Sequence, residues 1–111
     1  MPAMQILNQV KGGLPVSANF SSPTDGPAVL VLSGSVWCRN ADQMIGITLE
    51  LDGKAVGTAQ IFSNAASTHR AVVPSYIPVT LSIGNHTVTV VALNSQTTTD
   101  YNDVFDVTLI Y

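Results

Sequence analysis

Residues 45–53 read IGITLELDG, and this stretch decides the fold class. Isoleucine and leucine alternate along it with Gly, Thr and Glu, which is the two-residue period of a β-strand with one buried face. Asp52 and Gly53 then favour a two-residue turn, because both of its central positions need positive φ. The stretch therefore predicts a strand, a tight turn and a return strand over residues 54–62.

The same alternation recurs along most of the chain. The dipeptide Gly84-Asn85 predicts a second turn, which would join strands over 79–83 and 87–92 into a hairpin. In the segment 27–37, the continuous apolar run 29–32 predicts burial on both faces, and Gly34 predicts a bulge or a close backbone approach. Further strands are expected over 4–10, 70–73 and 104–111.

Loops are expected where Gly, Pro, Ser, Asn and Asp cluster, over 12–15, 21–26, 63–68 and 94–102. About eight strands with turns at these intervals are typical of two packed sheets, because a single sheet of that size tends to curl or split. We therefore predict an all-β, two-sheet antiparallel sandwich. A length of 111 residues predicts one domain, 1–111.

Charged residues make up only 10% of the chain, against about 25% in an average soluble domain. Neutral polar groups are easily buried against another chain, and interface cores are depleted in charge, so a homo-oligomer is favoured over a monomer. The four basic residues are scattered and the net charge is −3, which argues against nucleic-acid binding. No apolar run approaches the roughly 20 residues of a membrane span. The first ten residues lack the features of a secretion signal.

The order of elements from residue 45 onward carries a resemblance to a known class. A strand turns at 51–54, a second strand ends at Asn64, a loop holds His69, the run LSIGNHTV follows at 81–88, and a strand closes the chain at 105–111. This order resembles the jelly-roll head domains of the tumour necrosis factor and complement-head class, including phage fibre tips and bacterial surface proteins. The resemblance implies a trimer packed through one apolar sheet face, an extracellular or virion-associated setting, and recognition through loops.

A second resemblance leaves the topology open. The stretch around Gly84 and residues 86–88 is also similar to bacterial immunoglobulin-like repeats, in which a strand turns at Gly and returns as alternating Thr and Val. Both resemblances imply a sandwich. The jelly roll is the first interpretation and the immunoglobulin-like sandwich is the alternative.

The sequence offers few residues for catalysis or metal binding. His69 and His86 are the only histidines, and they belong to no spaced zinc pattern and no serine-nucleophile signature. A small hydrolase using either histidine is a remote hypothesis, and we predict no enzyme and no required cofactor. Asp100, Asn102 and Asp103 cluster in one loop, so Asp100 and Asp103 are candidate calcium ligands, although ordinary turn chemistry is the favoured explanation of the cluster.

Three aromatic residues are candidates for ligand binding. Tyr101 lies in the longest polar loop, where its ring could stack against the apolar face of a sugar while its neighbours Asp100, Asn102 and Asp103 fix orientation. Trp37 lies in the apolar segment 27–37, where core packing is the favoured interpretation. Tyr76 lies between two prolines and could cap a sheet edge.

These patterns favour a non-enzymatic recognition or adhesion head that binds a glycan or a surface receptor, as a trimer, through the loop of residues 94–103. The alternative is a purely structural assembly or virion decoration module, in which neighbouring subunits bury the neutral surface.

Overall fold

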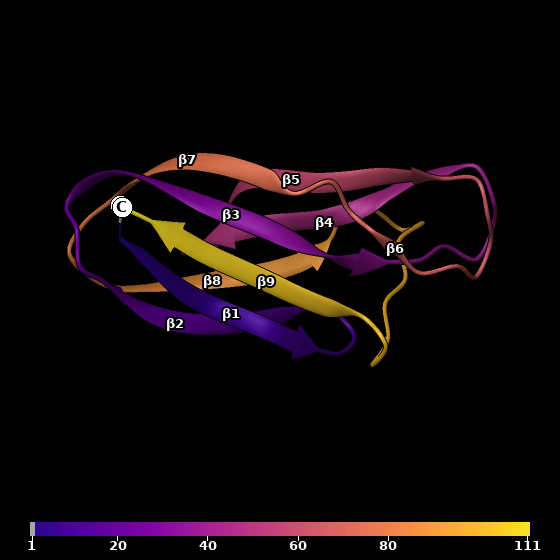
Figure 1. Cartoon of the computed structure of the whole chain (residues 1–111), viewed down its shortest axis with the longest axis horizontal. Coiled ribbons are helices and arrows are strands. Elements are labelled where there is room, and N and C mark those ends of the chain that lie inside the picture. The colour runs from indigo at the N-terminus through magenta and orange to yellow at the C-terminus, as the bar shows by residue number, and fades with distance from the viewer. Residues whose placement is uncertain (1) are drawn as a thin grey trace.

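Two antiparallel sheets pack face to face in the computed structural model, which describes residues 2–111 (Figure 1). One sheet has the order β1-β9-β3-β7, with the short β6 paired to the far end of β3. The other has the order β2-β8-β4-β5. The strands are β1 (Ala3–Lys11), β2 (Val16–Ser22), β3 (Gly26–Val36), β4 (Gln43–Leu51), β5 (Lys54–Ser63), β6 (Arg70–Ala71), β7 (Ser75–Leu81), β8 (Gly84–Ala92) and β9 (Val104–Ile110).

Alternate residues of the central strands fill the space between the sheets. Burying these aliphatic side chains supplies most of the driving force for packing the layers, because apolar area removed from water contributes about 25 cal/mol per Å². The fully buried side chains, each with 0% exposure, include Leu30, Leu32, Val36, Ile45, Ile47, Leu49, Val88, Val90, Phe105, Val107 and Leu109. The predicted sandwich is confirmed. Among the described residues, no helix is long and apolar enough to cross a membrane.

Two local predictions in β3 can be compared with the structure. Gly34 lies against β9, and a Cβ built there would approach Phe105 Cδ1 to 2.6 Å, so the predicted close approach is confirmed. The apolar run is buried on one face only, since Leu30 and Leu32 are fully buried whereas Val29 and Val31 are half-buried on the outer face. Cys38, two residues beyond the end of β3, is a buried free thiol.

The predicted hairpin between 79–83 and 87–92 is wrong. β7 pairs with β3, whereas β8 pairs with β2 and β4, so the turn at residues 82–83 carries the chain from one sheet to the other. Alternation reports that one face of a strand is buried, and it carries no information about which strand lies beside it. β2 was also not predicted, although Val16, Ala18 and Phe20 alternate with polar residues along it.

The turn between β4 and β5 has the predicted conformation, with φ of 52° at Asp52 and 84° at Gly53. Alanine at position 53 would have to adopt a left-handed backbone, which costs about 1 kcal/mol. Gly53→Ala is therefore expected to lower the free energy of unfolding in urea by that amount. Gly13→Ala is the matched control, because Gly13 has no positive φ and has room for a methyl group. Equal stability of the two variants would contradict the assigned turn.

Candidate functional site

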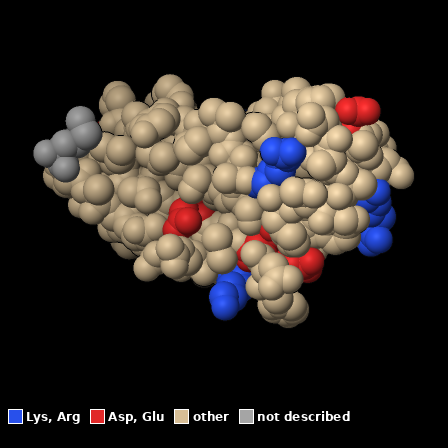
Figure 2. All heavy atoms as spheres, turned by 45° about the vertical axis from the view of Figure 1, so that its right-hand side comes forward, with Lys and Arg blue, Asp and Glu red and all other residues tan. Residues whose placement is uncertain are grey.

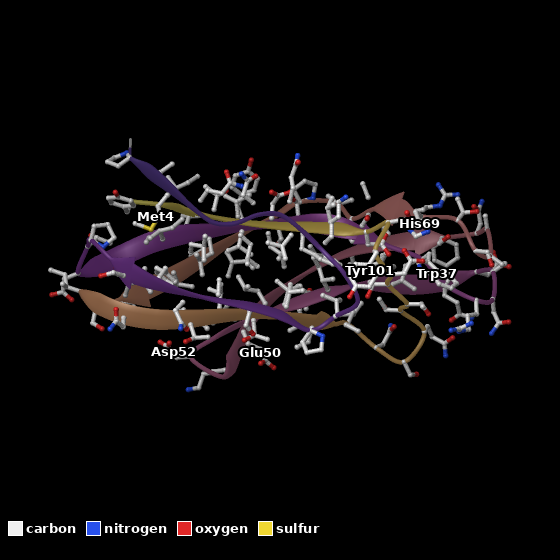
Figure 3. All side chains as sticks on the ribbon, turned by 90° about the horizontal axis from the view of Figure 1, so that it is seen from below. Met4, Trp37, Glu50, Asp52, His69 and Tyr101 are labelled. Atoms are coloured by element: carbon white, nitrogen blue, oxygen red, sulfur yellow. The ribbon has the colours of Figure 1, made fainter. Side chains whose placement is uncertain are left out.

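Three loops that are far apart in sequence meet at one end of the elongated sandwich (Figure 1). They comprise residues 37–42, 64–69 and 93–103, and Figure 3 shows Trp37, His69 and Tyr101 together at this end. Trp37 forms an antiparallel bridge with Thr98, with mutual backbone hydrogen bonds of 2.9 and 2.8 Å. This bridge fastens the first loop to the third. We call the surface formed by these three loops the loop end.

Asp103 organises the loop end from within, and its side chain is fully buried. Its Oδ1 lies 2.7 Å from the Ser35 hydroxyl and 2.7 Å from His69 Nδ1, and its Oδ2 accepts the Asp100 amide at 2.9 Å. One carboxylate thereby joins β3, the 64–69 loop and the turn before β9. Such a carboxylate, with both oxygens hydrogen bonded, holds the loops in one arrangement.

Tyr101 is presented at the tip of a tight turn formed by residues 100–103. The Asp103 amide donates to the Asp100 carbonyl at 3.0 Å, and the Asn102 amide donates to Asp100 Oδ1 at 2.8 Å. An aspartate that accepts from the amide two residues later is a common turn device. Because Tyr101 occupies the second position of this turn, its side chain is 79% exposed. Gly12 lies beneath it, since a Cβ there would be 3.7 Å from Tyr101 Cε1.

Trp37 is half-buried one residue beyond the end of β3, and its ring packs against two neighbouring side chains. Its ring centroid lies 5.9 Å from that of His69, and the Arg39 guanidinium carbon lies 5.4 Å from it. The indole nitrogen is buried and has no hydrogen-bond partner within residues 2–111. What Trp37 offers to solvent is therefore ring carbon, which suits stacking.

The structure brings together most of the residues predicted to bind a ligand. Trp37, Asp100, Tyr101 and Asn102 all contribute to the loop end, whereas Asp103 supports it from the interior. Tyr76 is 70% exposed but lies elsewhere. It pairs with Val31 of β3, six residues before Trp37, a separation of roughly 20 Å along the strand.

The predicted calcium ligands Asp100 and Asp103 lie close to His69, with one donor atom of each residue within 4.8 Å of the others. Both oxygens of Asp103 already accept hydrogen bonds, and His69 contributes nitrogen where calcium prefers oxygen. The donors therefore fit a hydrogen-bonded cluster better than a calcium site. We call this cluster, formed by Asp103 with Ser35, His69 and Asp100, the Asp103 hub. Calcium binding stays a prediction. Of the two carboxylates, that of Asp100 faces solvent and that of Asp103 is buried.

The sequence did not predict that Arg39 and His69 contribute to the loop end, although His69 was considered as a catalytic residue. Arg39 lies over Trp37, and His69 contacts both Trp37 and Asp103. His69 and Asp103 are 34 positions apart, and no local pattern signals their contact. Figure 2, which brings this end of the molecule forward, shows a few acidic and basic groups on a surface that is otherwise uncharged.

Comparison of the chain with known proteins gives similarity at the level of structure. No family model and no curated protein matches the sequence. The family 35 carbohydrate-binding module from Clostridium thermocellum has a TM-score of 0.56 at 17% identity, with 96% of this chain and 90% of that chain covered. The family 35 module from Cellvibrio japonicus Abf62 has a TM-score of 0.52 at 12% identity, with 99% and 94% covered.

Dimeric latent PorU from Porphyromonas gingivalis is also similar, with a TM-score of 0.58 at 9% identity. The match covers 97% of this chain and 12% of PorU, so the chain corresponds to a small part of that protein. At these identities the comparisons establish the fold, a jelly-roll β-sandwich, as predicted. The jelly-roll part of the predicted resemblance is confirmed. The neighbours give no support to the tumour necrosis factor and complement-head class in particular.

Proposed function

We propose that this chain is a non-catalytic glycan-binding domain whose site is the loop end. The observation that carries the proposal is the placement of two aromatic rings, exposed Tyr101 and half-buried Trp37, beside the polar groups of Asp100 and Asn102 at one end of a jelly roll. Sugar rings present apolar C–H faces that stack on aromatic rings, while their hydroxyls hydrogen bond to polar side chains. The similarity to carbohydrate-binding modules supports this function.

The construction of the site also supports binding in preference to catalysis. The Asp103 hub fixes the loops before any ligand arrives, which reduces the ordering cost of binding. His69 hydrogen bonds to the Asp103 carboxylate, and within residues 2–111 no serine hydroxyl hydrogen bonds to its ring. The hydrolase hypothesis based on His69 therefore lacks a serine hydrogen bonded to the histidine.

The proposal is tested by screening the domain on an array of plant and bacterial polysaccharides. We expect saturable binding to at least one polysaccharide, with bound sugar recovered unchanged after prolonged incubation. The heat-unfolded domain is the control for non-specific adhesion. Absence of binding across the array, or release of shortened sugars, would contradict the proposal.

Self-association is the second proposal, and it concerns a different surface. An apolar groove of about 530 Å³ crosses the outer face of the β3 sheet. A second copy of the chain is its proposed occupant, because a chain with 10% charged residues presents a neutral surface that a copy can cover. The groove is lined by Pro27, Ala28, Val29, Pro78, Val79, Thr80, Ile110 and Tyr111.

Light scattering after size exclusion tests self-association. We expect a trimer of the 11.7 kDa chain, which Val29→Lys should convert to monomers by placing a charge in the groove on the outer face. A monomeric wild-type chain at high concentration would contradict this part. We further propose that the self-associated domain works outside the cell or on a virion surface. In that setting, a surface receptor is the alternative partner to a glycan.

A further inference from the structure

His86 lies away from the loop end, between two turns that connect different pairs of strands. Its Nδ1 is 2.6 Å from Asp52 Oδ2 in the β4–β5 turn, and its Nε2 is 2.7 Å from the carbonyl oxygen of Ser82 in the β7–β8 turn. Its ring also stacks on Phe20 of β2, with centroids 5.6 Å apart. Figure 3 places Asp52 toward the opposite end of the molecule from Trp37 and His69.

Both ring nitrogens of His86 face hydrogen-bond acceptors, and this decides its protonation state. A neutral imidazole has one N–H and one lone pair, so one of the two acceptors would face a lone pair. The imidazolium has two N–H groups and can donate to Asp52 and to the Ser82 carbonyl at once. Only the charged imidazolium donates a hydrogen bond to both acceptors.

Ser82, His86 and Asp52 superficially form a serine–histidine–aspartate constellation. In such a triad, the histidine nitrogen facing the serine must carry a lone pair that accepts the hydroxyl proton. Here Ser82 Oγ is 3.4 Å from Nε2, whereas the Ser82 carbonyl oxygen is 2.7 Å away and accepts the hydrogen bond from the Nε2–H group. The geometry therefore leaves His86 without the lone pair that a general base needs.

We propose that Asp52, His86 and Ser82 form a protonation-dependent clamp that fastens the β4–β5 turn to the β7–β8 turn and is closed when His86 is an imidazolium. The clamp borders a polar recess of about 440 Å³, whose lining includes Asn19, Asn85 and Thr87. The charge of this recess depends on the clamp. With His86 protonated, the Asp52–His86 pair is neutral overall, and after deprotonation the recess carries the negative charge of Asp52.

The electrostatic surroundings agree with this assignment. Hydrogen bonding to Asp52, and then to the Ser82 carbonyl, raises the pKa of His86 above its ordinary value. Hydrogen bonding to His86, and then to the Thr87 amide, lowers the pKa of Asp52. On the packed elements, β2 and the β7–β8 turn contribute neutral groups. Glu50 and Lys54 flank the β4–β5 turn, and within residues 2–111 neither hydrogen bonds to His86.

The pH dependence has a definite sign. Since the pKa of His86 is raised on folding, its contribution is complete below the ordinary histidine pKa of about 6.5 and is lost as the pH rises through the folded value. Since the pKa of Asp52 is lowered, its contribution is complete above about 4 and is lost as the pH falls through the folded value. The clamp therefore stabilises the domain most between about pH 4 and 6.5.

An NMR pH titration of the His86 ring tests the clamp directly. The His69→Gln background leaves one histidine, so the single imidazole signal belongs to His86. We expect its pKa to lie above about 6.5 and to fall in Asp52→Asn. Asp52→Asn should also lower Tm by about 3 °C at pH 6, the scale of a partly exposed ion pair, and by less at pH 9.

Ser82→Ala is the matched variant, because it removes the hydroxyl and keeps the carbonyl that the clamp uses. We expect the His86 titration to be unchanged in this variant. A His86 pKa at or below about 6.5 in the intact clamp would overturn the proposal. A shift of the His86 pKa in Ser82→Ala as large as that in Asp52→Asn would also overturn it, because the Ser82 hydroxyl would then be the partner of Nε2.

Discussion

Asp103→Ala is expected to lower the free energy of unfolding by about 3 kcal/mol, because it leaves three polar groups without their acceptor. The Ser35 hydroxyl, the His69 ring and the Asp100 amide all lose the buried carboxylate that joins them. Each group left unpaired in a buried place costs about 1–3 kcal/mol, and partial access of water to His69 reduces the sum. Urea unfolding at neutral pH measures the loss.

Two further substitutions at aspartate positions make this result interpretable. Asp103→Asn keeps an acceptor for Ser35 and His69 and turns an amide donor toward the Asp100 N–H, so it should cost less than the alanine variant. Asp25→Ala, at an exposed position between β2 and β3, should change stability by less than about 0.5 kcal/mol. A loss below about 1 kcal/mol in Asp103→Ala would mean that the carboxylate does not organise the loop end.

Tyr101→Ala is expected to weaken glycan binding by about tenfold or more while leaving the fold intact. The ring is 79% exposed, so its removal takes away little buried area, whereas a sugar stacked on it would lose roughly 1.4 kcal/mol. Isothermal titration with an oligosaccharide from the array measures the affinity. Urea unfolding of the same variant should give a stability close to that of the original chain.

Tyr76→Ala is the matched control for this experiment. Tyr76 is the same residue type at a similar exposure of 70%, but it lies on the outer face of the β3 sheet. It should leave glycan affinity unchanged. Equal losses in both variants, or a loss only in Tyr76→Ala, would move the binding site away from the loop end.

The sequence predicted the sandwich because its strongest signals are local. The alternation over residues 45–51 and the turn at Asp52 and Gly53 depend on neighbours in the chain, and both were correct. The pairing of β7 with β3 and of β8 with β2 was not predictable in this way. It follows from how the two sheets close on each other, which joins segments far apart in sequence.

The candidate site shows the same division between local and distant information. The exposed position of Tyr101 follows from the turn that Asp100 and Asn102 form, and all three are adjacent in sequence. The burial of Asp103 was not foreseen, because it depends on Ser35, which is 68 positions away, and on His69. Two acidic residues that are three positions apart therefore have different roles: Asp100 faces solvent, whereas Asp103 is buried and holds the loops together.

His86 illustrates why residue types alone do not identify a catalytic group. Serine, histidine and aspartate meet in space at Ser82, His86 and Asp52, yet the proton on Nε2 is directed to a backbone carbonyl. The distinction rests on which oxygen of Ser82 lies closer to the ring, and only three-dimensional geometry supplies it.

Mapping the bound sugar on the domain tests the central claim most directly. In a ¹H–¹⁵N titration with an array-selected oligosaccharide, we predict shift changes concentrated at Trp37, His69 and residues 98–103. The amides of Asn19 and Thr87, at the polar recess of the clamp, should stay unperturbed. Changes centred on that recess, or on the groove of the β3 sheet, would contradict the assignment of the glycan site to the loop end.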